Sequence, residues 1–568
     1  MAADVKALHR LYQALKTERK PWESAWRDLA DHFLPTRWRS DEDTTSSRKP
    51  KLNSGLIDTT GVLDIRTMAA GLQGGMTSPV RPWFKLEFSD REANEMSDAG
   101  VWLDEVTQLM QAALHNSNFY NAIHTLYADV GTFGTGCMIE TADYNGLRFD
   151  VVRCGEYVAD IGPDNTVDTV YRRIYMTARQ IVETFGEKKV PEIVRLFSES
   201  RDCNQTVQRF NVIHAIFPRD RFDKPATAPD KPWASVYYMY EGEAQKPHLL
   251  SESGFETCPF FVPRWDISGT DVYGTSPAMD VLSDCRVLQQ IGRTLLTTFH
   301  KSIDPPMSVH SALRSVGLKL TPGAVNYVDW SGTGNPVAAT PIVQPDPKSI
   351  EVAIQAREDV RKCVHEGLYN DLFKMMMLDD RRQITATEIN AREAEKLVLI
   401  GPVVERLHKE LFSPVIARTF DLMRQWDYLP PIPGGLEGAA IEVNFVSVLA
   451  QAQRVTATSS IDQTVAFVAQ AGQAMPEMVD SLDPDRLIDA YAENLGVPKA
   501  ILRSQEDRDA IRQARAEQQQ AMMKAAQQAQ AAQNIQGLAG AAQSLGQTPV
   551  GADGETALGA ILGGMGRM

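Results

Sequence analysis

The strongest pattern of apolar positions in this chain lies between residues 385 and 426. Apolar residues recur there three, four, seven or eight positions apart, which is the period of an α-helix. Thr385 and Glu388 form a capping box at its start. Pro402 and Pro414 each remove one backbone donor, but the stripe continues past both, so we expect kinks instead of helix ends. The apolar positions are Ile389, Leu397, Ile400, Val404, Leu407, Leu411, Val415, Leu422 and Trp426.

The length of this predicted helix indicates the type of assembly to which the chain belongs. At the rise of an α-helix it would span roughly 60 Å. Few single globular domains need a helix of that length. A ring or a rod, in which a helix bridges several layers, does need one.

Two further helical patterns flank a proline-rich segment. Ser276 and Pro277 are favoured residues for an N-cap and a first helical position, and an apolar stripe follows them as far as Phe299. Asp346 and Pro347 begin the second pattern in the same way. The segment 304–346 between them contains six prolines and short strand-like pieces. We therefore expect the two helices to lie side by side, with a small β-containing insertion at one end.

The region before residue 276 combines helices with a period-two pattern. Helices are predicted at 3–34 (broken at Lys20-Pro21), 56–72, 95–115 and 119–130, followed from Gly134 by strands. Thr177 and Gln180 form a capping box for one helix among the strands, and Gly186 is its expected C-cap. These patterns predict an α+β region with an antiparallel sheet. The predicted strands are Lys85–Phe88, Gly136–Glu140, Leu147–Val152, Val167–Tyr175, Arg209–Phe217, Ser235–Tyr240 and Phe260–Trp265.

The chain changes character after the long helix. A proline-rich break at 430–433 precedes a strand at Ile441–Phe445 and helices at about 449–472 and 484–495. From Arg508 the sequence is rich in Ala and Gln, with good helix formers first and more glycine later. We expect this tail either to extend a helical barrel or to be disordered.

Composition narrows the class of protein. The 568 residues suffice for several cores, and 43% hydrophobic with 23% charged residues is ordinary for a soluble protein. The net charge of −15 argues against tight nonspecific binding of duplex DNA, although not against a surface past which DNA slides. Six scattered cysteines without a C-x-x-C pair indicate reduced thiols. We find neither a signal peptide nor an apolar run long enough to span a membrane.

Motifs for catalysis are missing from the sequence. There is no phosphate-binding G-x-x-x-x-G-K-[ST] motif, and Gly131–Gly136 follows a helix instead of a strand, which favours a tight turn. Asp379, Asp380 and Glu388 are candidates for a metal-dependent nuclease or packaging-associated hydrolase, but Arg381 and Arg382 neutralise the first two. We expect no catalytic residue, no metal and no cofactor, with the hydrolase as the alternative.

Four stretches in order carry a family resemblance. The chain resembles the portal, or head-to-tail connector, proteins of short-tailed bacteriophages over roughly residues 1–505. The last stretch has Val448 where the family pattern has proline. The stretches are Thr77–Phe84, Tyr273–Pro277, Gln383–Ile389 and Phe445–Gln453.

The resemblance implies a ring-forming subunit with a portal-like fold. It implies a twelve-subunit ring at one capsid vertex of the virion, assembled in the host cytoplasm, with a central channel for double-stranded DNA. It also implies partners: the terminase packaging motor, tail adaptor proteins, scaffolding protein and the major capsid protein. The implied parts are a wing region, 1–275; a first stem helix, 276–302; a clip, 303–346; a second stem helix, 347–372; a tunnel loop, 373–384; a long kinked wing helix, 385–428; a wing return, 429–480; crown helices, 481–507; and the Ala/Gln-rich tail, 508–568.

The implied tunnel loop supplies the candidate DNA-channel residues. Lys374, Arg381 and Arg382 flank a run of three methionines, Met375, Met376 and Met377. A few phosphate contacts per subunit, set against an acidic background, would hold DNA weakly enough to let it move. In the alternative interpretation the methionines fill a gap between subunits and the arginines pair with neighbouring aspartates. A passive scaffold without a DNA channel remains a third possibility.

Overall fold

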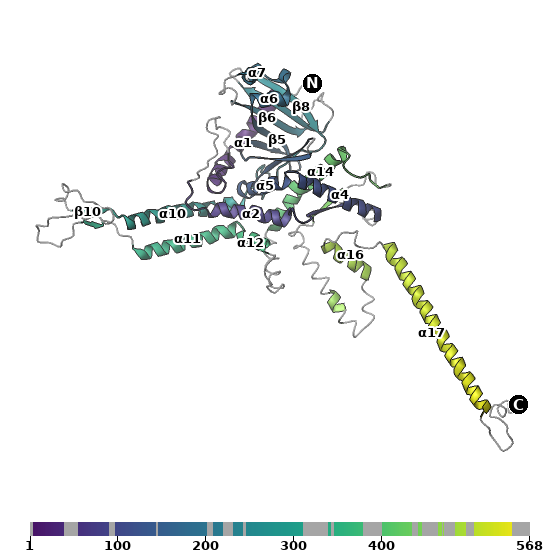
Figure 1. The fold of residues 1–568 in the computed structure, drawn as a ribbon. Coiled ribbons are helices and arrows are strands. Elements are labelled where there is room, and N and C mark those ends of the chain that lie inside the picture. The colour runs from purple at the N-terminus through teal and green to yellow at the C-terminus, as the bar shows by residue number, and fades with distance from the viewer. Residues whose placement is uncertain are drawn as a thin grey trace, which may run out of the picture. The chain divides into compact units, whose positions relative to one another are not determined.

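The structure of the chain is a computed structural model (Figure 1). It forms two units, one of residues 1–94 with 102–496 and one of residues 95–101 with 497–568. The larger unit combines helices with antiparallel sheets, which confirms the predicted α+β class. The structure describes residues 4–38, 55–89, 97–143, 146–200, 208–219, 231–241, 246–309, 339–341, 346–378, 400–433, 441–445, 464–468, 470, 483–495 and 505–547.

A five-stranded antiparallel sheet in the order β4-β5-β6-β7-β8 has helices on both faces. Along β6, Ile213 and Phe217 join a core with α1, whereas Phe210 and Val212 join a core with α6 and α7. Both faces of the sheet are therefore closed within one chain. The bounds are α1 Val5–His32, β4 Tyr157–Ile161, β5 Val167–Thr177, α6 Ala178–Phe185, η1 Glu187–Lys189, α7 Glu192–Glu199, β6 Arg209–Pro218, β7 Trp233–Glu241 and β8 Lys246–Phe255.

The inner strands of this sheet follow the sequence pattern, and its edges do not. The predicted ends of β5, β6 and β7 agree with the structure within two residues. The pattern misses β4 and β8, the two edge strands. β8 contains Pro247, two serines and Gly254, a composition that edge strands tolerate because one side of the strand needs no ladder partner. The predicted capping box is confirmed, with Thr177 and Gln180 bonded to each other's backbone and Gly186 at the C-cap.

The predicted break at Lys20-Pro21 is wrong, because α1 runs uninterrupted past Pro21. Pro21 removes one intrahelical hydrogen bond, but the helix is anchored on both sides of it. Arg19 is buried before the proline and donates to the carbonyl of Tyr157. Trp26 is buried after it and donates from Nε1 to the Phe133 carbonyl at 3.0 Å. Tertiary contacts therefore override the local signal.

Two smaller antiparallel sheets lie in the same unit as the five-stranded sheet. β2 pairs with β3 and β9, and β1 pairs with β12 in a register that opposes Phe84 to Phe445. The strand predicted at Ile441–Phe445 is confirmed as β12, so a late segment returns to the start of the chain. The bounds are β1 Phe84–Phe88, α4 Ser97–Asn116, α5 Phe119–Phe133, β2 Cys137–Asp143, β3 Gly146–Val152 and β9 Phe260–Phe261.

Helix α2, Thr60–Met76, contacts α5, α11 (Pro347–Gly367) and α12 (Asn370–Leu378). The sequence pattern predicted this helix at 56–72. The helix instead continues to Met76, because Gly75 and Met76 are buried in its packing. A Cβ added at Gly71 would lie only 2.5 Å from Phe373, so α2 and α12 approach closely at this position.

The long helix is described from residue 400 onward. It contains a π-helical turn at His408–Phe412 and continues as α14, Ser413–Gln425. The Ser413 N–H bonds to the His408 carbonyl five residues back, and the wide turn directly precedes Pro414, which has no N–H to donate. The helix therefore continues past both of its prolines. Thr385 and Glu388 lie outside the described residues.

A buried ion pair fixes the long helix to the rest of its unit. The Glu410 carboxylate accepts from the Arg264 backbone N–H at 2.9 Å and from its guanidinium at 2.7 Å. The same guanidinium donates to the carbonyls of Asn165 and Asp271. Charge and hydrogen bonds are thus satisfied together, which a buried pair requires.

Each of the two helices predicted after residue 275 is interrupted once in the structure. Ser276 is the predicted N-cap and accepts from the Met279 N–H at 3.2 Å. The first helix breaks at Val281, and the second breaks at 368–369, where Tyr369 has a φ of 53°. The two breaks lie close together, since a Cβ at Gly367 would lie 2.3 Å from the Val281 side chain. The expected loop at 373–384 is helical as far as 378. The bounds are α9 Pro277–Asp280, α10 Leu282–Ile303, β10 Met307–Val309, β11 Ala339–Pro341, α11 Pro347–Gly367 and α12 Asn370–Leu378.

Three helical stretches are described near the C-terminus. Residues 464–468 and 470 are helical, within the helix predicted at 449–472. α16, Pro484–Leu495, has its predicted bounds. In the smaller unit α17 runs from Gln505 to Gln547, and its described side chains are almost all exposed.

Candidate assembly surface and channel segment

Helices α10 and α11 pack side by side, and a short antiparallel ladder follows their adjoining ends (Figure 1). In that ladder β10 opposes β11, with Met307 across from Pro341 and Val309 across from Ala339. The chain therefore leaves α10 and re-enters α11 at neighbouring points. The residues between the two strands, 310–338, are outside the described part.

The segment before α2 fastens both helices of the pair. The Gln289 side chain on α10 accepts from the N–H groups of Ile57 and Asp58 at 2.8 and 3.1 Å. Arg361 on α11 donates to Asp58 Oδ2 at 2.7 Å, while Thr60 donates to Oδ1. Thr60 and Arg361 lower the pKa of Asp58 against the opposing effect of burial. The carboxylate is thus held ionised where the two helices meet the core.

The apolar stripe of α10 is covered along only half of its length. Cys285, Leu288 and Leu295 are buried. In the last two turns the stripe is open, with Leu296 exposed by 49%, Phe299 by 41% and Ile303 by 84%. The described part of the chain therefore leaves at least two-fifths of each of these three side chains uncovered. Contiguous exposed apolar side chains of this kind are typical of a protein–protein contact.

The predicted channel residues are only partly described. Lys374 is exposed on α12, and Met375, Met376 and Met377 belong to the same helix, although their side chains are outside the described part. The same holds for the whole of Arg381 and Arg382. Their contact with DNA stays a prediction, and it now concerns residues at the end of a helix as well as beyond it.

The candidates for catalysis receive no added support. In the described residues no three His, Cys, Asp or Glu side chains are grouped as metal ligands, while Asp379, Asp380 and Glu388 lie outside them. Gly134 ends α5 with a φ of 77°, which confirms that the glycine-rich segment is a tight turn. A Cβ there would lie 2.1 Å from the Gly274 carbonyl, so the glycine is needed for packing. Among the described residues no helix is long and apolar enough to cross a membrane.

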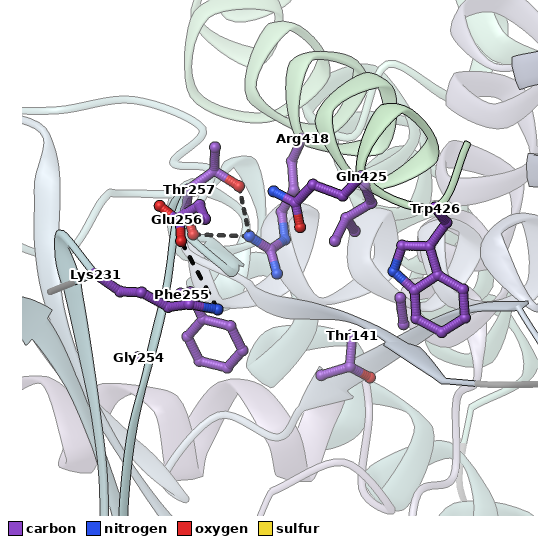
Figure 2. Close-up of a pocket in the computed structure, with 11 residues that line it drawn as sticks. Thr141, Lys231, Gly254, Phe255, Glu256, Thr257, Arg418, Gln425 and Trp426 are labelled. Atoms are coloured by element: carbon purple, nitrogen blue, oxygen red, sulfur yellow. Dashed lines mark hydrogen bonds and ion pairs between the residues drawn. The ribbon is translucent and has the colours of Figure 1, made fainter. Parts of the chain in front are cut away.

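A hollow of about 310 Å³ lies beside the end of α14 (Figure 2). Figure 2 shows the Arg418 guanidinium beside Thr257, whose carbonyl and hydroxyl oxygens each accept from Nη1 at 2.7 Å. Arg418 Nε also lies 3.8 Å from Glu140 Oε2, and Thr419 donates to Oε1 at 3.0 Å. Burial raises the pKa of Glu140 to about 8, although Arg418 and Thr419 oppose the shift. Arg418 thus holds α14 to its neighbours.

The sequence pattern predicts the apolar stripe but not which half of it is open. Leu296 and Phe299 belong to the predicted stripe of the first helix, since both follow the helical period. Periodicity identifies the side that is buried somewhere, whether in the same chain or in another copy. Only the structure distinguishes the covered turns from the open ones.

Comparisons with known proteins identify the family to which the chain belongs. A family model described as bacteriophage head to tail connecting protein matches residues 5–502. A probable portal protein of Bordetella phage BPP-1 is 35% identical over 523 residues, covering 92% of this chain and 93% of the relative. The portal protein of Salmonella phage epsilon15 is 34% identical over 529 residues, covering 92% and 93%. The portal protein of Escherichia phage T7 is 22% identical over 451 residues, covering 74% and 75%. The resemblance found in the sequence is thus confirmed, and the chain belongs to the family of bacteriophage head-to-tail connecting proteins.

Proposed function

We propose that this chain is one subunit of a portal ring of twelve copies at a capsid vertex, with a channel through which double-stranded DNA is packaged and ejected. The observation that carries the proposal is the open apolar stripe at Leu296, Phe299 and Ile303, in a chain whose relatives are portal proteins. A helix pair of this kind loses water-exposed apolar surface only when a neighbour covers it. A head-to-tail contact repeated by rotation closes into a ring.

The proposed parts have distinct tasks. α10 and α11 form the stem, and residues 303–346 form the clip on which the terminase motor docks during packaging and tail adaptors dock afterwards. The region before residue 276 forms the wing, which faces scaffolding and major capsid proteins. This division assigns no catalytic residue, cofactor or metal to the chain.

The proposed channel segment follows α11. Lys374, Arg381 and Arg382 supply positive charge, while Met375–Met377 supply soft apolar surface. The acidic net charge of −15 keeps the rest of the protein from holding DNA tightly. Weak phosphate contacts repeated around a ring restrain the DNA without stopping it, and their strength falls with salt.

The proposal is tested by making the open stripe polar. The Leu296→Gln/Phe299→Gln variant should fold with an unchanged circular dichroism spectrum but stay monomeric in light scattering. The matched control is Ile193→Gln/Leu196→Gln, which changes two exposed apolar residues three positions apart on α7 and should still form rings. Rings formed equally well by the stem variant would contradict the proposal.

A further inference from the structure

The chain changes direction between α11 and α12. α11 ends at Gly367, and Tyr369 has a left-handed φ of 53°, a conformation that is unfavourable for a residue with a bulky side chain. The Phe373 N–H then bonds to the Tyr369 carbonyl at 3.1 Å as α12 begins. Such a backbone persists only where its surroundings hold it.

Helix α2 provides those surroundings by close packing. Phe373 is fully buried and Leu372 nearly so. A Cβ at Gly71 of α2 would lie 2.5 Å from the Cβ of Phe373, so only glycine admits the ring at that distance. α12 is thus fixed to α2 on the far side of the bend.

One carboxylate of α2 holds both sides of the bend. Asp64 Oδ2 lies 2.6 Å from His365 Nδ1, before the bend, and Oδ1 accepts from Asn370 Nδ2 at 2.6 Å, after it. Asp64 and Asn370 are both buried. Burial raises the pKa of Asp64, an effect that His365 and, more weakly, Lys374 oppose and Asp371 adds to.

We infer that Asp64 is a positioning residue that sets the direction in which α12 leaves α11, and with it the placement of the channel segment. The inference rests on the proposed function, since it assumes that the chain around and beyond α12 faces DNA. The Asp64–His365–Asn370 contact acts as a latch across the bend. If this contact opens, a buried amide or carboxylate loses its partner, which costs free energy. Separation of α12 from α2 would expose that group to water and remove the cost.

The test exchanges donor and acceptor within the latch of the full-length protein. Asn370→Asp places a second carboxylate against Asp64, and at mildly alkaline pH the two repel each other. We expect amide hydrogen exchange in residues 370–378 to accelerate at least about tenfold, while residues 347–367 and the five-stranded sheet keep their rates. The double variant Asp64→Asn/Asn370→Asp restores a donor opposite an acceptor, and the amide oxygen introduced at position 64 can still accept from His365. It should return exchange to the wild-type rate, which general destabilisation would not do.

DNA retention is measured on the same variants after ring formation has been scored by light scattering. Asn370→Asp rings should retain DNA poorly, and the swapped double variant should regain retention. The matched control is Asp28→Asn, which removes a carboxylate from an exposed pair with Arg286 and should change neither readout. Unchanged exchange in 370–378, no rescue by the swap, or faster exchange with normal retention would each overturn the inference. A wild-type chain that forms no rings would instead contradict the proposed function.

Discussion

The proposed wing, the region before residue 276, and the helix pair formed by α10 and α11 use apolar surface in opposite ways. In the wing, the five-stranded sheet is covered on one face by α1 and on the other by α6 and α7, so both cores are closed within one chain. In the pair, α10 and α11 cover each other for part of their length, and the stripe of α10 ends in Leu296, Phe299 and Ile303, each of which the described part of the chain leaves at least two-fifths uncovered. The sheet region thus closes its cores within one chain, whereas in the proposed ring neighbouring subunits would cover the open end of the helix pair.

The ion pairs of the two regions also differ in how deeply they are buried. The Arg264–Glu410 pair, which joins the wing to the long helix, is buried, and the Arg264 guanidinium also donates to the Asn165 carbonyl. In the helix pair, Arg361 is partly exposed and binds both Asp58 and Glu358. Changes within the wing should therefore alter folding stability, and changes in or beyond the helix pair should alter assembly and partner binding.

The largest expected effect separates the clip from the wing. Replacing residues 304–346 with a short Gly/Ser linker should leave a folded, ring-forming protein, because β10 and β11 bring the two ends of the insertion together. Binding of the terminase motor, measured by co-sedimentation, should be abolished. Motor binding by the shortened protein would place the docking surface elsewhere.

The next effect concerns the buried pair of the wing. Glu410→Ala leaves the Arg264 guanidinium buried without its carboxylate, which should destabilise the wing by about 3–5 kcal/mol. Chemical denaturation measures this loss. The control Glu183→Ala, from an exposed pair with Arg179, should change the midpoint little. Equal effects of the two variants would show that burial of the pair does not matter.

A third effect depends on pH through Glu140. Its folded-state pKa of about 8 exceeds the ordinary 4.5, so the folded state binds the proton more tightly than the unfolded state. The resulting stability is present below pH 4.5 and is lost as the pH rises through about 8. Between pH 4.5 and 7 the loss from this one group should be about 3 kcal/mol. The free energy of unfolding, measured by chemical denaturation at each pH, should lose this pH dependence in Glu140→Gln and keep it in Glu183→Gln. Parallel pH profiles of the wild type and Glu140→Gln would refute the prediction.

The smallest effect should come from the proposed channel segment. Arg381→Ala/Arg382→Ala should assemble normally but package or retain DNA several-fold less well, with a weaker dependence on salt. Arg179→Ala/Arg195→Ala removes the same charge from α6 and α7 and serves as the control. Wild-type packaging and retention by the Arg381/Arg382 variant at every salt concentration would leave the segment without a role in holding DNA.

The sequence predicted those helices and strands whose caps and apolar patterns depend on residues that are close together in the chain. The caps at Ser276 and Thr177, the strand Ile441–Phe445 and the helix 484–495 all follow from a few adjacent residues. The break predicted at Pro21 failed because distant partners anchor α1 on both sides. The bend at Tyr369 was missed for a similar reason, since the packing that holds it comes from α2.

The same distinction applies to the candidate site. The stripe containing Leu296 and Phe299 is a local pattern and was predictable, but its open half depends on what the rest of the chain covers. Asp64 and His365 are separated by 301 positions, so no local signal relates them. A sequence pattern can therefore indicate which residues are candidates for an interface. The residues that hold them in position are recognised only in the three-dimensional structure.

The most direct test of the central claim is the mass and end view of the purified full-length protein, by native mass spectrometry with negative-stain electron microscopy. We predict a closed ring of twelve copies with a central channel, lost in Leu296→Gln/Phe299→Gln and retained in Ile193→Gln/Leu196→Gln. Only monomers and dimers under assembly-permissive conditions, with no ring at the capsid vertex, would contradict it.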